Sequence, residues 1–123
     1  MELNEITKAI IGCGIRVHKE LGPGLLESSY ETCLEYELRQ NGFKVDRQLK
    51  QPIFYRGRDI DAKYFLDLVV EDEVVVEVKS VKMLLPIHDA QLLTYLRLSK
   101  KKLGLLMNFN VTLLRDGIRR KIN

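Results

Sequence analysis

The sequence contains no tryptophan, few prolines and cysteines, and no long apolar run. Without about 20 consecutive apolar residues, no segment is expected to span a bilayer. The N-terminus has no basic segment followed by an apolar one, so no secretory signal is predicted and a cytoplasmic location is expected. Cys13 and Cys33 are then expected to be reduced and buried rather than bridged. His18 and His88 are too scattered to complete a zinc site.

The remaining composition is that of an ordinary folded protein. Its 123 residues are 46% hydrophobic and 30% charged, so residues 1–123 are interpreted as a single domain. The net charge of +3 is mildly basic and does not by itself indicate nucleic-acid binding. Basic residues gather within residues 47–63, 100–102 and 119–121, where a solvated surface is the simplest interpretation of each group taken alone.

Apolar residues at helical spacing predict three helices, over residues 4–21, 26–40 and 88–99. The first of them contains Gly12 and Gly14. Each glycine weakens a helix by about 1 kcal/mol, so the pair predicts close packing against a neighbouring backbone.

Alternating or short apolar segments predict strands over residues 43–55, 103–109 and 118–122, with a hairpin over residues 65–79. Pro52 lacks an N–H donor, so the first of these strands is expected toward a sheet edge. Residues 56–59 are predicted to be a turn. The order α-α-β-β-β-α-β-(β) predicts an α+β or mixed α/β fold, with a central mixed sheet flanked by helices.

Three ionisable residues interrupt the apolar hairpin: Asp67 on its first strand, and Glu77 and Lys79 on its second. If residues 71–73 form the loop, Asp67 falls directly opposite Glu77. Like charges in that arrangement repel unless a cation lies between them. A divalent metal ion is the expected cation, with Lys79 beside it.

The hairpin contains the groups that metal-assisted phosphodiester hydrolysis requires. Mg²⁺ binds one or two protein carboxylates and leaves positions for water and phosphate oxygens. Lys79 would orient the attacking water and offset transition-state charge. In the alternative interpretation, Asp67 faces solvent and Glu77 pairs with a basic residue. The apolar character of the second strand favours the metal site, because charged residues in a covered strand are rarely buried unless paired or bound to metal.

Two helical motifs bear on the same site. Gly24-Leu-Leu-Glu27-Ser-Ser-Tyr30 places an acid and a tyrosine one turn apart, and Gln91-Leu-Leu-Thr-Tyr95 places an amide and a phenol on one helix face. Taken separately, they are also consistent with a glutamate stabilised by the helix dipole and a half-buried tyrosine.

Taken together, these motifs resemble the GxxExxY proteins, a small family within the PD-(D/E)XK nuclease-like superfamily, over nearly the whole chain. Glu27, Asp67, the Glu77–Lys79 pair and the Gln91–Tyr95 pair follow the order found in RecB-like members. Leu66 stands where the superfamily name places a proline. The resemblance implies a restriction-endonuclease-like core.

The resemblance also implies residue roles. Glu27, Asp67 and Glu77 would be the catalytic acids that hold Mg²⁺, with Mn²⁺ as a substitute. Lys79 would be the catalytic base or electrostatic helper. The residues expected to line the site are Gln91, Tyr95, Tyr30 and His88.

Three of the surrounding residues have two interpretations. His88 would touch a phosphate, or it would cap or pack the third helix, which is slightly favoured. Tyr64 and Phe65 would stack on bases, or they would pack in the core, which is the favoured interpretation.

The sequence therefore predicts a Mg²⁺-dependent nuclease acting on nucleic acid, with DNA as the favoured partner. The first alternative is a non-catalytic nuclease-fold protein that binds nucleic acid or a protein partner, with a homodimer as one form. The second is a phosphohydrolase acting on a small nucleotide. No membrane partner is expected.

Overall fold

The computed structural model describes residues 1–123, which form three helices and two β-sheets. The helices are α1 (Leu3–Leu21), α2 (Glu27–Gln40) and α3 (Pro86–Ser99), with a short 3₁₀ helix η1 (Leu114–Gly117). The strands are β1 (Val45–Gln51), β2 (Phe54–Tyr55), β3 (Arg58–Asp59), β4 (Tyr64–Val70), β5 (Val74–Lys79), β6 (Leu103–Asn108) and β7 (Ile118–Ile122).

The main sheet has five strands in the order β1-β4-β5-β6-β7. Only β5 and β6 are parallel, and α3 connects them, as a parallel pair requires. The edge position predicted for the first strand from Pro52 is confirmed. The predicted class is confirmed as well: an α+β protein with a mixed sheet flanked by helices.

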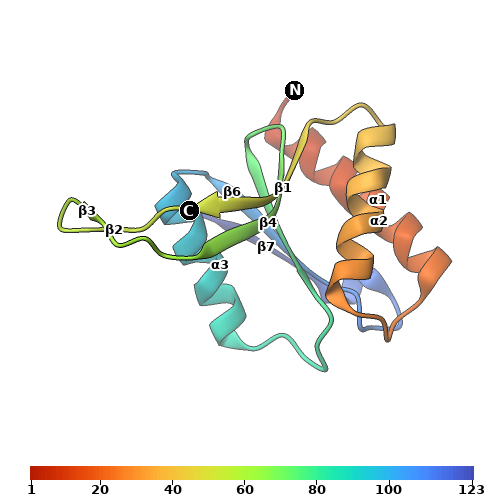
Figure 1. Ribbon diagram of the computed structural model, residues 1–123. Helices are drawn as coiled ribbons and strands as arrows, with labels where there is room; N and C mark the ends of the chain where they lie inside the picture. Colours follow the sequence, from red (N-terminus) through yellow and green to blue (C-terminus); the bar gives the residue numbers. More distant parts are fainter.

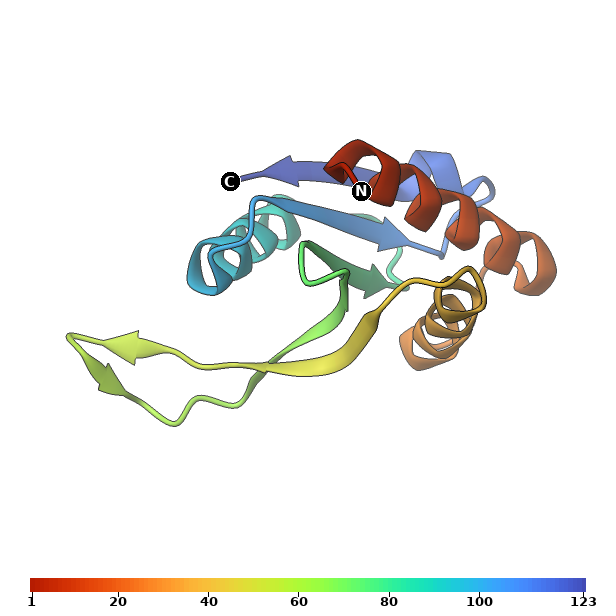
Figure 2. The same ribbon diagram turned by 90° about the horizontal axis from the view of Figure 1, so that it is seen from above.

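Helices cover both faces of this sheet, with α1 and α2 on one face and α3 on the other (Figures 1 and 2). The valines of β5 therefore serve two cores. Val74, Val76 and Val78 pack with α1 and α2, and Val75 packs beneath α3. This explains why β5 is apolar at both alternating sets of positions, and it confirms a central strand covered on both faces.

The two glycines of α1 have different surroundings. A Cβ at Gly14 would overlap the Met107 side chain and lie 3.1 Å from Leu114, whereas the nearest atom to a Cβ at Gly12 is 3.9 Å away on Arg16. Close packing is therefore confirmed at Gly14, although side chains rather than backbone supply it. At Gly12 the prediction is wrong.

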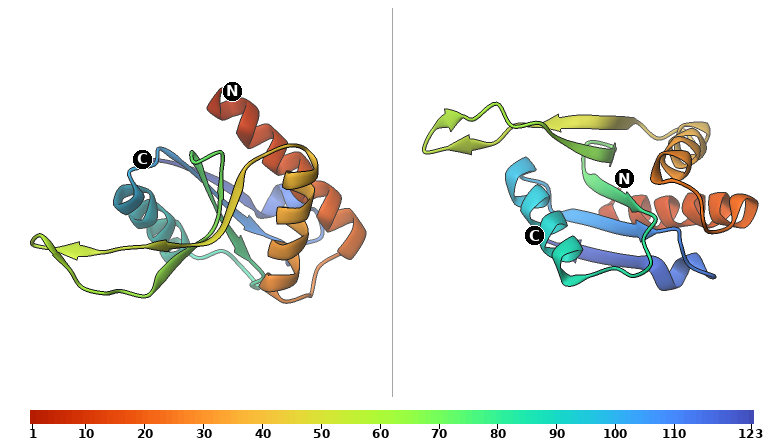
Figure 3. Two further views of the ribbon diagram at one scale, coloured as in Figure 1. Left: turned by 45° about the horizontal axis from the view of Figure 1, so that its top comes forward. Right: turned by 60° about the horizontal axis from the view of Figure 1, so that its bottom comes forward.

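The predicted continuous strand over residues 43–55 is wrong, because it divides at Pro52 into β1 and β2. The predicted turn over residues 56–59 is too long. The turn consists of Arg56 and Gly57 alone, because Arg58 and Asp59 form β3 and pair with Tyr55 and Phe54. The resulting β2–β3 hairpin is separate from the main sheet and extends away from the body of the molecule (Figures 2 and 3).

No helix is long and apolar enough to cross a bilayer. Both cysteines are free thiols, with Cys13 buried and Cys33 partly exposed.

The difference between the glycines of α1 predicts opposite responses to one added methyl group. Gly12→Ala should raise the free energy of unfolding by about 1 kcal/mol, because alanine favours the helix. Gly14→Ala should be less stable than Gly12→Ala by about 1–3 kcal/mol, because Met107 and Leu114 must move. Urea unfolding of both variants measures this difference, and equal stabilities would show that the space beside Gly14 is not restricted.

Candidate active site

The site is organised by the register of β4 against β5. Their loop is residues 71–73, as predicted, and the ladder ends where Leu68 faces Val76. The next opposed pair is Asp67 and Glu77. The three-residue loop therefore brings the two acids onto neighbouring strands at the same level of the sheet.

At this level the two carboxylates replace the backbone ladder. The Asp67 N–H donates to Oε2 of Glu77 at 3.0 Å, and the Val78 N–H donates to Oδ2 of Asp67 at 2.9 Å. Each acid thus accepts an N–H from the opposite strand. This exchange holds two like-charged groups side by side, although they repel each other.

The β4 strand is locally distorted at Asp67. Leu68 packs with α1 and α2, whereas Leu66 packs beneath α3, although residues two apart in a regular strand share a face. Gln48, which lies opposite Asp67 on β1, has a positive φ of 51°. The β1–β4 ladder omits both residues, so the distortion affects both strands at this level.

Burial and the negative charge of neighbouring acids dominate the electrostatics of Asp67 and Glu77. Burial, followed by the charge of Asp67, raises the pKa of Glu77 from 4.5 to about 8. Burial and the charge of Glu31 raise the pKa of Asp67, against the opposing effect of the Val78 N–H. The charge of Lys79, which is half-buried, lowers both values. A protein without a cation at this position therefore holds Glu77 largely protonated near neutral pH.

A third acid, Glu31, approaches this pair from α2. It is 5% exposed, and its Oε1 accepts hydrogen bonds from Arg47 at 3.0 Å and from the Gln48 amide at 2.8 Å. The same Gln48 amide donates to Oδ1 of Asp67 at 3.2 Å. Glu27, four residues earlier, is exposed and makes no hydrogen bond or ion pair.

The sequence interpretation missed Glu31. The available signal was its spacing, because Glu31 lies three residues before Leu34 and seven before Leu38, on the buried side of the helix. An acid placed beside such a stripe requires a partner, which Arg47 supplies.

The α3 side of the site carries the Gln91–Tyr95 motif. Tyr95 is 8% exposed, and its pKa is raised by burial and then by the charge of Glu77. The Gln91 side-chain amide donates to the Tyr95 hydroxyl at 3.2 Å. The structure thus brings Tyr95 near the acids, with the exposed Gln91 joined to it.

Tyr64 lies between this motif and solvent. Its ring centre is 6.3 Å from that of Tyr95, and 46% of the residue is exposed. Phe65 is 42% exposed. The favoured interpretation of these two residues as core packing is therefore wrong, because both side chains are exposed to solvent.

His88 caps α3. Its ring Nδ1 accepts a hydrogen bond from the Leu85 backbone N–H at 2.9 Å. The backbone N–H of His88 donates to the Leu85 carbonyl, also at 2.9 Å. This confirms the capping interpretation of His88.

Tyr30 of the Gly24–Tyr30 motif is fully buried and stacks on Phe109 with 4.6 Å between ring centres. Its hydroxyl donates to the Gly22 carbonyl at 2.6 Å and accepts from the Leu25 N–H at 3.1 Å. In this structure the motif tyrosine therefore fixes the turn that leads into α2.

The residues present fit a divalent cation. No group of three His, Cys, Asp or Glu side chains is arranged to hold a metal. Mg²⁺ needs only one or two protein carboxylates together with several waters, however, and the like-charged Asp67–Glu77 pair meets this requirement.

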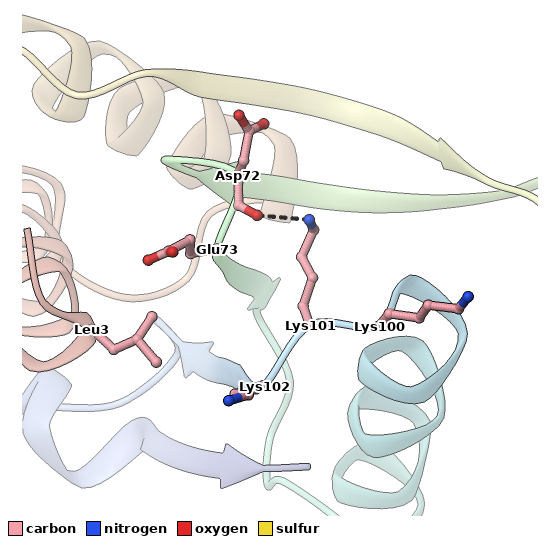
Figure 4. Close-up of a pocket in the computed structure, with 6 residues that line it drawn as sticks. All are labelled: Leu3, Asp72, Glu73, Lys100, Lys101 and Lys102. Carbon is pink, nitrogen blue, oxygen red and sulfur yellow. Dashed lines mark hydrogen bonds between the residues drawn. The ribbon is translucent and has the colours of Figure 1, made fainter.

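A cavity of about 340 Å³ lies at the opposite end of β5 from Glu77 (Figure 4). Asp72, Glu73 and residues 100–102 line it, and the Lys101 ammonium donates to the Asp72 carbonyl at 2.6 Å. The Asp72 carboxylate is already paired with Lys44 at 2.8 Å. This cavity is separate from the acids and is not part of the candidate active site.

The mixed sheet, the flanking helices and the acids on neighbouring strands define a restriction-endonuclease-like protein. A family model described as the PD-(D/E)XK nuclease superfamily matches residues 4–121, and the chain belongs to this superfamily. No curated protein and no solved structure matches the chain.

The raised pKa of Glu77 predicts that the free energy of unfolding of the metal-free protein falls as the pH rises. Between pH 4.5 and about 8, the folded state retains a proton that the unfolded state has lost, so stability is highest below this window and is lost through it. At about 1.4 kcal/mol per pKa unit, the decrease amounts to a few kcal/mol. Glu77→Gln should remove most of it, as measured by urea unfolding in EDTA from pH 5 to 8.

The matched control is Glu73→Gln, an exposed glutamate next to the same strand, which should retain the parent's decrease. A stability difference between Glu77→Gln and the parent that does not grow with pH would contradict the prediction.

Proposed function

We propose that the protein is a Mg²⁺-dependent nuclease of the GxxExxY kind that hydrolyses phosphodiester bonds in nucleic acid. DNA is the expected substrate, and Mn²⁺ is the expected substitute metal. The proposal rests on one observation: the Glu77 carboxylate accepts the Asp67 N–H and the Asp67 carboxylate accepts the Val78 N–H, with Lys79 on the strand of Glu77. Membership of a nuclease superfamily whose members generally use divalent metals supports it.

Asp67 and Glu77 are the proposed metal ligands. Burial, followed by the negative charge of neighbouring acids, raises the pKa of both carboxyl groups, and a bound cation would offset both effects. Cation binding and deprotonation of Glu77 would therefore occur together. The chemistry that the cation supplies when bound is neutralisation of phosphate charge and a lower pKa for water. Glu27, which is exposed at the start of α2, is proposed as a further acid that contributes when metal and substrate are bound, and Glu31 supports Asp67 through Gln48.

Lys79 is the proposed group that acts on the attacking water. Glu77 and Lys79 are two residues apart on β5 and so share a face, on which a lysine can orient water and offset negative charge as it develops on the phosphate. The water oxygen adds to phosphorus and gives up a proton to solvent, the bond from phosphorus to the leaving oxygen breaks, and that oxygen takes up a proton from solvent, which leaves a phosphate monoester and an alcohol. Tyr95 and Gln91 are proposed to line this space from α3.

Cleavage assays with plasmid, single-stranded DNA, RNA and nucleotides in Mg²⁺ test the proposal. Lys79→Ala and Asp67→Ala should each reduce the cleavage rate by about 100-fold or more, because each removes a group that stabilises the transition state or the metal. Lys8→Ala, an exposed lysine on α1, should cleave as the parent does.

Calorimetry that finds no divalent-metal binding, together with an Asp67→Ala variant identical to the parent, would contradict this proposal. Nucleic-acid binding without cleavage would favour the non-catalytic alternative, and hydrolysis of nucleotides alone would favour the phosphohydrolase.

Glu27 and Glu31, which both lie on α2, should respond differently to the same substitution. Glu27→Gln should change the free energy of unfolding by less than about 0.5 kcal/mol, because the side chain is exposed and unbonded, yet it should lower the Mg²⁺-dependent rate. Glu31→Gln should cost about 1–3 kcal/mol of stability, because it disrupts buried bonds to Arg47 and Gln48. Urea unfolding and cleavage rates separate the two effects, and an unchanged rate for Glu27→Gln would remove Glu27 from the site.

A further inference from the structure

Residues 52–63, here called the arm, connect β1 to β4 and project from the body of the molecule. They contain β2 and β3, which pair only with each other (Figure 3). Phe54 and Tyr55 are 62% and 64% exposed, and Ile60 is 52% exposed. A segment that leaves several large apolar side chains in water is a surface for an interaction rather than part of the core.

The tip of the arm surrounds one aromatic ring with positive charge. Arg56 and Gly57 both have positive φ, at 49° and 80°, as a two-residue type I′ turn requires. Tyr55 pairs with Arg58 across the strands, so their side chains share a face. The Arg56 guanidinium lies 5.6 Å from the centre of the Tyr55 ring. An exposed ring is thus accompanied by two guanidinium groups.

These two arginines differ from the other basic residues at or near the arm. Lys50 and Lys63 both pair with Asp61, at 3.9 and 3.0 Å, whereas Arg56 and Arg58 form no ion pair. Guanidinium groups without a protein partner match the geometry and the charge of phosphate. An anionic partner is therefore favoured over a second copy of this mildly basic chain.

The exposed ring indicates which kind of polyanion would bind. Aromatic side chains stack on bases that are not already stacked in a duplex, so single strands offer them a partner and a continuous duplex does not. Tyr55 presents such a ring between the two guanidinium groups.

The arm is also continuous with the proposed active site. Its return segment leads directly into β4, in which Tyr64 is half exposed and packs near Tyr95, and Asp67 follows three residues later. Along an extended strand, this spacing from Tyr64 to Asp67 is about 10 Å. A nucleic-acid strand held at the tip of the arm would thus meet Tyr64 between the tip and the acids.

We infer that the arm binds single-stranded nucleic acid, with Tyr55 stacking on an unpaired base while Arg56 and Arg58 contact flanking phosphates. This inference rests on the proposed function and adds a substrate class to it: nucleic acid that is single-stranded next to the cleaved bond. DNA and RNA share this chemistry.

Fluorescence anisotropy tests the inference with labelled oligonucleotides of about 20 nucleotides: single-stranded DNA, single-stranded RNA and a blunt DNA duplex. Measurements are made in EDTA, so that no cleavage occurs. Tyr55→Ala should weaken binding of at least one single strand by about tenfold, because a stacking partner is lost. Tyr55→Phe should bind within about twofold of the parent, because the ring remains, and duplex binding should change little.

The arginines are tested through salt dependence. Each phosphate contact with a single strand contributes about 0.7 to the slope of log K against log salt concentration. The double variant Arg56→Ala/Arg58→Ala should therefore reduce the magnitude of this negative slope by about 1.4, which means a weaker dependence of binding on salt. Matched controls are Tyr36→Ala on α2, where the tyrosine is 61% exposed, and Arg115→Ala, an exposed arginine without an ion pair. Both controls should bind as the parent does.

Three outcomes would overturn the inference. In the first, Tyr55→Ala binds single strands as tightly as the parent. In the second, it loses duplex affinity to the same extent as single-strand affinity. In the third, sedimentation shows a dimeric parent that Tyr55→Ala converts to monomers without changing nucleic-acid affinity, which would make the arm a contact between copies. Because binding is measured without metal, these outcomes are separate from loss of Mg²⁺-dependent cleavage, which bears on the proposed function.

Discussion

The site depends on the exchange of backbone N–H groups between the strands of Asp67 and Glu77. A regular ladder would have continued through this level and left the carboxylates free to separate. Here the carboxylates accept the N–H groups themselves, so their repulsion cannot be relieved by a change of rotamer without leaving backbone donors unsatisfied. The irregular backbone of β4 and the positive φ of Gln48 accompany this arrangement. An irregular backbone is thus combined with a pair of buried acids, of which Glu77 keeps its proton near neutral pH when no cation is bound.

The end of the parallel pair β5 and β6 provides a fixed base for these groups. The Lys79 carbonyl accepts the Phe109 N–H at 2.9 Å. The Asn108 side chain binds the loop that follows β5. Its Oδ1 accepts the Val81 backbone N–H at 3.1 Å, and its Nδ2 donates to the Val81 carbonyl at 3.0 Å. The backbone of the proposed catalytic lysine is therefore tied to a buried strand. Sites in α/β sheets often occupy this carboxyl end of parallel strands, where the chain leaves the ladder.

Local pattern was sufficient to predict the opposition of Asp67 and Glu77, because a short loop and an alternating strand fix the register. It was not sufficient for Glu31, whose burial depends on how α2 packs against Arg47 of a distant strand. The division of the first strand at Pro52 was also missed, because alternation does not reveal whether a strand has a neighbour or a covering layer. The predicted helices and strands were therefore more accurate than the contacts among them.

The continuity of β4 has a consequence for local unfolding. Its sequence runs from the arm, which has no core beneath it, to Val69 and Val70, which are fully buried. Amide hydrogens near Tyr55 can exchange with solvent through small openings, whereas those near Val70 exchange only when the core opens. The first buried residue of β4 is Leu66, so the boundary between these regimes lies just before Asp67. A proposed metal ligand thus lies just inside the part of the strand that is protected from hydrogen exchange.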